Sequence, residues 1–192
     1  MEALAAMSME KNFKHWHGDI ETTDTPLEAG KNIRYIFTST IIFTYVEYFK
    51  TNRVPISLFV IVGLRFLCKL NNNVNFKGKE ALQELVKLPL KKRLLGFTVD
   101  DPSVDLNGGE VIYRDGSRVV GYIKRAGYGY TINKHIGFGY VELEEDERHV
   151  ASKETLKQIL ESKYELEIMG KKVVAEPFIR APYDSKRRKI LV

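Results

Sequence analysis

Short apolar runs separated by turn residues dominate the chain from residue 93 onward, a spacing typical of a small antiparallel β-barrel or β-sandwich. The pattern predicts strands at 94–99, 110–114, 118–123, 136–143, 164–168 and 173–178. Asp115-Gly116 separates the second strand from the third. Because a tight hairpin turn requires positive φ angles, this dipeptide predicts that the two strands are paired. A second turn is predicted at Gly170-Lys171, between the last two strands.

Helical spacing of apolar residues predicts three helices. Residues 2–13 form the first, and because it starts abruptly we expect the natural domain to extend further upstream. The second covers 78–89 and ends at a proline, and Ser152 caps the third. We therefore predict an α+β chain, with a partial α+β domain over 1–92 and a β-barrel domain over 93–192.

The stretch after Gly30 differs in composition from its surroundings. Residues 31–62 contain six Ile, four Phe, four Val and three Tyr, but no Gly, no Ala and a single acid, Glu47. Of these 32 residues, 17 are Phe, Ile, Tyr, Asn or Lys, whose codons begin with two A or T letters. The codons at both ends can also be written as a splice donor and a splice acceptor in one frame. We hypothesise that residues 31–63 are a translated intron and that Gly30 natively precedes Leu64.

Two other interpretations of this insert are weaker. A membrane-spanning helix needs about 20 consecutive apolar residues, but charged residues and Pro55 interrupt the run. A genuine surface insertion would cost little closure entropy, yet the stretch lacks the Gly, Asp and Ser-rich turn chemistry of a loop. The sequence therefore predicts no membrane partner.

Removing the insert changes what the net charge implies. The chain has 192 residues and a formal charge of +5, of which the insert contributes +3, since it holds four basic residues and one acid. With about +2 left on about 159 residues, the sequence predicts no nucleic-acid partner. The basic run 186–189 is typical of a solvated tail. Cys68, the single cysteine, excludes an internal disulfide framework, and we expect no targeting peptide in residues 1–14.

No motif in the sequence indicates a self-contained active site: glycine-rich nucleotide loops, a phosphate loop, a nucleophile elbow and spaced Cys/His ligands are absent. His15 and His17 could form half of a metal site, but two histidines flanking a tryptophan in a polar loop are more often surface residues. The glycine–tyrosine run 127–130 is interpreted as barrel turns with packed aromatic rings, and the acidic run 144–147 as a solvated hairpin tip. We predict no catalytic and no metal-binding residues.

A set of ordered motifs remains once the insert is set aside. Upstream they are Met9-Glu10-Lys11, His15-Trp16-His17-Gly18-Asp19, Thr25-Pro26-Leu27-Glu28-Ala29-Gly30-Leu64 and Phe76-Lys77-Gly78-Lys79-Glu80-Ala81-Leu82. The barrel region adds Arg93-Leu94-Leu95-Gly96-Phe97, Gly137-Phe138-Gly139-Tyr140-Val141 and Pro182-Tyr183-Asp184. Together they resemble the folate-binding aminomethyltransferase family, which includes the glycine-cleavage T-protein and the C-terminal halves of dimethylglycine and sarcosine dehydrogenases. Lys14-His15-Trp16-His17 and Ile123-Lys124-Arg125-Ala126 look closest to the sarcosine dehydrogenase branch.

The resemblance implies the end of a folate-binding α+β domain followed by a small C-terminal β-barrel. The complete enzyme of this branch oxidises sarcosine with a covalently held FAD and passes the one-carbon unit to tetrahydrofolate in the mitochondrial matrix. This chain has no counterpart of the flavin domain or of the segment that carries the family's catalytic Asp. We therefore expect a C-terminal fragment that is inactive alone, with a partial tetrahydrofolate site and with FAD only in the full-length parent.

Two residues are carried over by resemblance as folate-binding. Phe66 stands at the family's aromatic position that walls the folate, where it can stack on a pterin but offers no hydroxyl. Tyr183 matches the tyrosine that faces the folate near the end of the barrel, although a packed surface aromatic is an equal alternative. Ser8 replaces an Arg that contacts the ligand in the T-protein, which favours the sarcosine dehydrogenase branch. Glu28 is either a ligand-side carboxylate or, more simply, a loop acceptor.

The alternative function belongs to another class. A non-catalytic regulatory or interaction module can use the same fold, as in a relative that regulates pyruvate dehydrogenase phosphatase. A flavin domain upstream in the same transcript would favour the enzyme, and its absence would favour the regulatory module. The expected small-molecule partner is a folate, and no particular partner protein is predicted.

Overall fold

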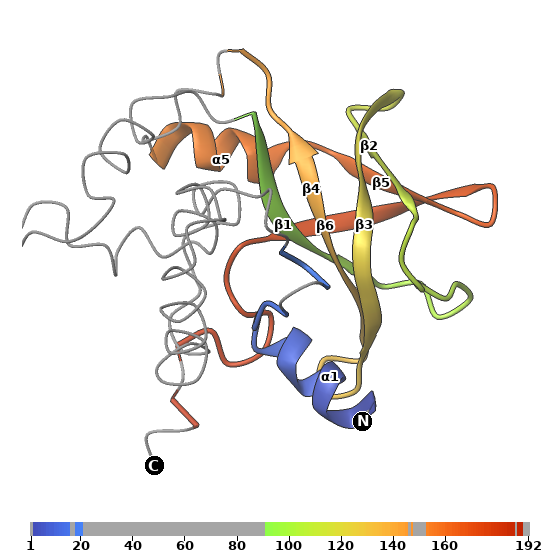
Figure 1. Ribbon diagram of the computed structural model, residues 1–192, viewed down its shortest axis with the longest axis vertical. Coiled ribbons are helices and arrows are strands. Elements are labelled where there is room, and N and C mark those ends of the chain that lie inside the picture. Colours follow the sequence, from blue (N-terminus) through green and yellow to red (C-terminus); the bar gives the residue numbers. More distant parts are fainter. Residues whose placement is uncertain are drawn as a thin grey trace, which may run out of the picture.

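Six antiparallel strands close into a barrel in the order β1-β4-β3-β2-β5-β6 (Figure 1). They are β1 (Lys92–Val99), β2 (Val111–Arg114), β3 (Arg118–Gly129), β4 (Lys134–Glu142), β5 (Tyr164–Ile168) and β6 (Lys171–Phe178). Helix α1 (Glu2–Glu10) lies outside the barrel, and helix α5 (Lys153–Glu161) lies on the connection from β4 to β5. The computed structural model describes residues 2–15, 18–20, 91–145, 147, 153–186 and 188–189. The six predicted strands are confirmed.

Alternate residues of the strands fill the barrel interior. In β5 the inward-facing Tyr164, Leu166 and Ile168 are buried, while the residues between them are partly exposed. Since successive side chains of a strand point to opposite faces, this burial has the same period of two that predicts the strand. Phe97 of β1 meets Tyr164 edge to face, with the ring centroids 5.3 Å apart. The core also contains Leu95, Val99, Ile112, Ile123 and Val141.

Two tight turns lie at or next to the positions that the sequence predicts. Asp115 and Gly116, with φ angles of 50° and 103°, join β2 to β3 and confirm the predicted hairpin. Met169 and Gly170, with φ angles of 50° and 77°, join β5 to β6 one residue before the predicted turn. The β2–β3 loop has three residues, 115–117, and the β5–β6 loop has two, 169–170. Left-handed φ angles in such short loops match the twist of the paired strands.

Strand β3 is longer than predicted, because it continues past Ile123 to Gly129 alongside β4. The interpretation of the glycine–tyrosine run as turns is therefore wrong for residues 127–129, which belong to the strand, and only Tyr130 lies in a turn. The register shifts just after Ile123, as at a β-bulge, and the glycines interrupt the apolar alternation on which strand prediction depends. The expected aromatic packing is present, since the rings of Tyr128 and Tyr130 meet edge to face at 5.2 Å.

Helix α5 closes the end of the barrel where β4 finishes and β5 begins (Figure 1). Ile159 is fully buried against the barrel core, and Leu156 packs beside it. The Tyr164 hydroxyl donates a hydrogen bond to the Ile159 carbonyl at 3.0 Å. The predicted third helix is therefore confirmed, while its predicted cap, Ser152, lies outside the described residues.

Helix α1 ends at Glu10 and not at residue 13. Asn12 takes a left-handed φ of 58°, and the Phe13 amide donates to the Ser8 carbonyl at 2.8 Å, as in a helix C-terminal cap. The predicted helix over 78–89 and the insert lie outside the described residues, and the boundary between the two domains stays a prediction. Within the described ranges, neither the length nor the apolar character of any helix suffices to cross a membrane.

Candidate functional site

Residues 2–15 and 18–20, here called the N-terminal segment, pack against the outside of the barrel. The Glu10 carboxylate accepts a hydrogen bond from the Thr131 amide at 2.6 Å, in the turn between β3 and β4. Met9 is buried against β3, and a Cβ added to Gly127 would lie 3.2 Å from its sulfur. The Met-Glu-Lys motif therefore attaches helix α1 to the β3–β4 hairpin.

A buried ion pair joins the end of this segment to β3. Arg125 donates from Nε to Asp19 Oδ1 at 2.8 Å and from Nη2 to Oδ2 at 2.6 Å. Asp19 is completely buried, and its Oδ2 also accepts the His15 amide at 2.6 Å. Arg125 Nη2 further donates to the Phe13 carbonyl at 3.0 Å. Two parallel N–H···O bonds fix both distance and orientation, so this pair sets how the segment lies on the barrel.

The chain that follows β6 returns to the same segment. The Tyr183 amide donates to the Glu10 carbonyl at 3.2 Å, and Lys11 Nζ donates to the Asp184 carboxylate at 2.9 Å. The bond from Lys11 holds the pKa of Asp184 below its usual value. The Nζ atoms of Lys11 and Lys189 each lie 4.7 Å from the centroid of the Tyr183 ring, and Lys189 donates to the tyrosine hydroxyl at 2.9 Å. Tyr183 is therefore half-buried between α1 and the basic tail.

The structure places one of the two predicted folate-binding residues. Tyr183 lies at the junction of α1 and the tail, and its role toward folate stays a prediction. Phe66 and Glu28 lie outside the described residues. Ser8 donates to the Ala5 carbonyl at 2.6 Å, and Arg125 Nη1 lies 3.4 Å from its hydroxyl oxygen.

The other candidates add no binding site to the described part of the chain. His15 is exposed, while His17 and Cys68 lie outside it. Across the described ranges, no three His, Cys, Asp or Glu side chains are grouped so that they could hold a metal ion. In the basic run 186–189, the side chains of Lys186, Arg188 and Lys189 are exposed, as expected of a solvated tail.

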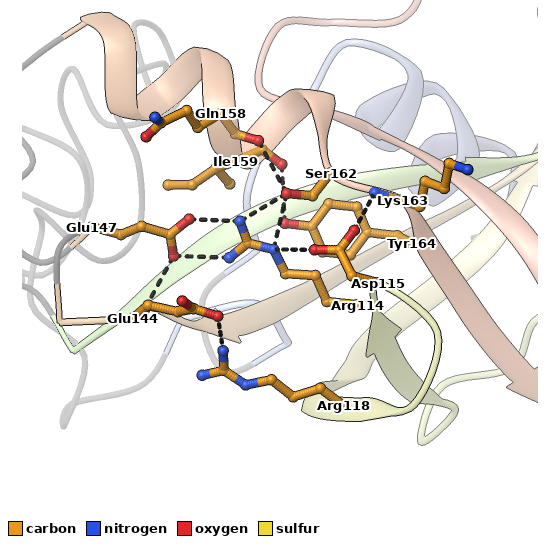
Figure 2. Close-up of polar contacts among 10 residues, drawn as sticks. All are labelled: Arg114, Asp115, Arg118, Glu144, Glu147, Gln158, Ile159, Ser162, Lys163 and Tyr164. Carbon is orange, nitrogen blue, oxygen red and sulfur yellow. Dashed lines mark hydrogen bonds and ion pairs between the residues drawn. The ribbon is translucent and has the colours of Figure 1, made fainter.

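A second polar cluster lies at the end of the barrel that α5 closes (Figure 2). Arg114 donates from Nη1 to Glu147 Oε2 at 2.8 Å and from Nη2 to Oε1 at 2.6 Å. Glu147 is only 4% exposed, so the interpretation of 144–147 as a solvated tip is wrong for this residue, because Arg114 holds its carboxylate in the protein. Glu144 is exposed and pairs with the exposed Arg118.

This cluster connects the β2–β3 hairpin to both ends of the connection that contains α5. Arg114 also donates from Nε and Nη2 to the Ser162 hydroxyl, at 3.0 and 2.7 Å. The Lys163 amide donates to the Asp115 carboxylate at 3.1 Å. The hydrogen bonds to Glu147 raise the pKa of Arg114 above its ordinary value. The charged groups of this cluster are thus paired with one another and tie the hairpin to the connection.

Sequence reasoning missed three of these polar residues: the buried Asp19 and Glu147 and the partly buried Arg125. Asp19 and Arg125 fall inside motifs that carry the family resemblance, and this membership is the only signal that could have singled them out. Their pairing spans 106 positions of the chain, so no local pattern indicates it.

Comparisons with known proteins agree with this architecture. Residues 92–184 match the family model of the glycine cleavage T-protein C-terminal barrel domain. Mitochondrial sarcosine dehydrogenase of Mus musculus is 30% identical over 98% of this chain and 16% of its own length. The mitochondrial pyruvate dehydrogenase phosphatase regulatory subunit of the same organism is 27% identical over 97% of this chain and 18% of its own length. The chain thus spans less than a fifth of these relatives.

A solved structure shares the fold. The glycine cleavage system aminomethyltransferase T from Bartonella henselae superposes with a TM-score of 0.54 at 16% sequence identity, over 94% of this chain and 37% of that one. Residues 92–184 are a glycine cleavage T-protein C-terminal barrel domain, and the solved structure shows that the fold is shared. The family and the fold class predicted from the sequence are therefore confirmed.

Proposed function

We propose that the chain is the C-terminal part of a sarcosine-dehydrogenase-like flavoprotein of the mitochondrial matrix and that it is inactive alone. The observation that carries the proposal is the junction at Tyr183, where the Met9-Glu10-Lys11 motif meets the tail of the barrel. Two motifs from opposite ends of the chain thus contribute to one surface. Similarity to mitochondrial sarcosine dehydrogenase and, at 29% identity, to mitochondrial dimethylglycine dehydrogenase supports the same branch.

Tetrahydrofolate fits this junction only as a partial site. Tyr183 offers a half-buried phenol ring to a pterin, and the ammonium group of Lys189, bonded to the neutral tyrosine hydroxyl, suits a carboxylate of a folate. Lys11 is already paired with Asp184 and positions the ring. Phe66 is proposed as the second wall. With two walls, one face of the pterin stays in water and loses much of the burial that ligand pockets provide. FAD is proposed for the longer parent, and no redox step is assigned to the described residues.

The purified chain is expected to bind tetrahydrofolate with a Kd weaker than about 1 μM, because the pocket is incomplete. Calorimetry measures this, alongside a flavin absorbance scan and a sarcosine oxidation assay. Tyr183→Ala should abolish the residual binding and Tyr183→Phe should retain it, while Tyr130→Ala, at an exposed tyrosine elsewhere, serves as the control. Tighter binding, bound flavin or turnover of sarcosine would each show that the fragment proposal is wrong.

A regulatory module remains the second candidate, favoured by the similarity to the pyruvate dehydrogenase phosphatase regulatory subunit over 97% of the chain. In that case the barrel surface and not the folate junction is the functional element. A change in the rate of a pyruvate dehydrogenase phosphatase on addition of the chain, with no folate binding, would favour this candidate.

Deleting residues 31–63 is expected to raise the melting temperature of the chain or to turn an aggregating product into a soluble one. The reason is that Ile41-Ile42-Phe43 and 57–62 are uncharged, β-prone runs of the kind that aggregate when exposed. Thermal unfolding and light scattering of the two chains provide the measurement. A deletion variant less stable than the parent would contradict the hypothesis that residues 31–63 are foreign to the fold. Sequencing of the full-length cDNA tests directly whether they are a translated intron.

A further inference from the structure

Lys14, in the N-terminal segment, is buried against the outer face of the barrel. The residue is 6% exposed, and its Nζ lies 3.4 Å from the centroid of the Phe138 ring in β4. Nζ donates a hydrogen bond to Asn12 Oδ1 at 2.6 Å, and no other acceptor for it is found among the described residues. One acceptor leaves most of the N–H donors of an ammonium group without a partner, because an ammonium group has three of them. A neutral amine has fewer N–H donors to satisfy.

The charges around Lys14 do not compensate a second cation. From its own segment Asp19 faces it, but both carboxylate oxygens of Asp19 are already bonded to Arg125 and to a backbone amide. From β3 Arg125 faces it, and the guanidinium carbon lies 5.3 Å from the same Phe138 ring. From β4 comes the face of the Phe138 ring, which attracts an ammonium group but carries no net charge to balance it. When Lys14 is protonated, two cations therefore share one anion in a buried setting.

Burial and charge act on Lys14 in a definite direction. Burial lowers the pKa of Lys14 from 10.5 to about 7. The attraction of Asp19, the next largest influence, raises it and offsets only part of the burial cost, and the smaller repulsion from Arg125 lowers it further. The cluster can therefore exist in two states near neutral pH, one with a neutral amine and one with an ammonium group.

We propose that the seating of the N-terminal segment on β3 and β4 is controlled by the protonation of Lys14, with the segment held firmly when the amine is neutral and loosened when it is charged. The segment carries Glu10 and Lys11, so that its seating also sets the position of Tyr183 and of the tail. This inference does not depend on which ligand the junction binds.

The sign of the effect follows from the two pKa values. A released segment exposes Lys14, which then has its ordinary pKa of 10.5, while in the seated segment the pKa is about 7. The released state binds the proton more strongly, so seating weakens as pH falls from 10.5 to 7, by up to about tenfold in the equilibrium constant per pH unit. Below pH 7 both states carry the proton and the dependence ends.

Two measurements on the full chain test the proposal between pH 6 and pH 10. A side-chain NMR titration of Lys14 reports its pKa directly. Hydrogen exchange of the Thr131 amide, corrected for intrinsic rates, reports seating, because this amide donates to Glu10. We expect a Lys14 midpoint near 7 and protection of Thr131 that increases as pH rises above it.

Variants separate Lys14 from other titrating groups. Lys14→Met should keep Thr131 protected at all pH values, and Lys14→Arg should leave it weakly protected throughout. Lys157→Met, at a lysine of α5 whose side chain is 74% exposed, should behave as the parent. A Lys14 midpoint near 10.5, or an unchanged pH dependence in Lys14→Met, would overturn the proposal. If Lys14→Met does not fold, the NMR titration of the parent decides by itself.

Discussion

Replacing Arg114 with methionine is expected to destabilise the protein by about 3–5 kcal/mol, whereas the same replacement of Arg93 is expected to be neutral or to stabilise it by about 1–4 kcal/mol. Both arginines are buried, at 6% and 1% exposure. Removing Arg114 leaves the buried Glu147 carboxylate without its cation. Removing Arg93 leaves no such charge, because its Nε and Nη2 have no hydrogen-bond partner among the described residues.

Urea unfolding of the two variants measures this difference in stability. The comparison is matched, because both variants replace a buried arginine with the same uncharged side chain, methionine. The double variant Arg114→Met/Glu147→Met supplies the control, since removing both charges should recover much of the loss. Burial lowers the pKa of Arg93 to about 10, so its guanidinium keeps the charge at neutral pH and the cost of burying it persists. If Arg93→Met lost as much stability as Arg114→Met, an acceptor for Arg93 would have to exist.

Replacing Gly121 with alanine is expected to destabilise the barrel by roughly 3 kcal/mol or more, or to prevent it from folding. A Cβ at this position would lie 1.9 Å from the Tyr140 carbonyl oxygen, a backbone atom of β4. Gly121 itself pairs with Val141 in the β3–β4 ladder, so relief of the clash would require the two strands to separate.

Gly127→Ala in the same strand is the matched control for Gly121→Ala. Its Cβ would meet only the Met9 sulfur, at 3.2 Å, and a thioether at the end of a flexible side chain can move away. We expect it to cost less than about 1 kcal/mol. Thermal unfolding distinguishes the two variants. Equal melting temperatures would show that β4 can shift to accommodate a methyl group at position 121 at little cost in stability.

Features that depend on neighbouring residues are predictable from the sequence, and features that depend on distant ones are not. The β2–β3 hairpin follows from Asp115-Gly116, because the turn itself fixes the φ angles. The strand order cannot be predicted in this way, since β2 pairs with β5 across the α5 connection and β6 pairs with β1. The glycine–tyrosine run 127–129 is a strand because β3 continues in its pairing with β4. The end of α1 is a local feature, a left-handed Asn12 with the Phe13 amide bonded to the Ser8 carbonyl, which helical periodicity does not indicate.

The candidate site shows the same division. Tyr183 is singled out by family resemblance, but the lysines around its ring come from α1 and from the tail, and only the folded chain brings them together. Lys14 has an ordinary sequence context, and its pKa is lowered first by burial against strands of the barrel and then by the charge of Arg125, which lies more than 100 positions away. The acidic run 144–147 has the composition of a solvated hairpin tip, and only the folded structure shows that Arg114 of β2 pairs with Glu147.

The pairing of β1 with β6, in which Gly96 faces Phe178, has a consequence for how the barrel forms during synthesis. Strand β1 is the first strand of the barrel to leave the ribosome, and β6, one of its two partners, is the last. Until then its open edge can add a strand from another nascent chain. Contacts between such distant residues also form slowly. We therefore expect that chains truncated before residue 178 recruit chaperones, whereas chains extended beyond it are released.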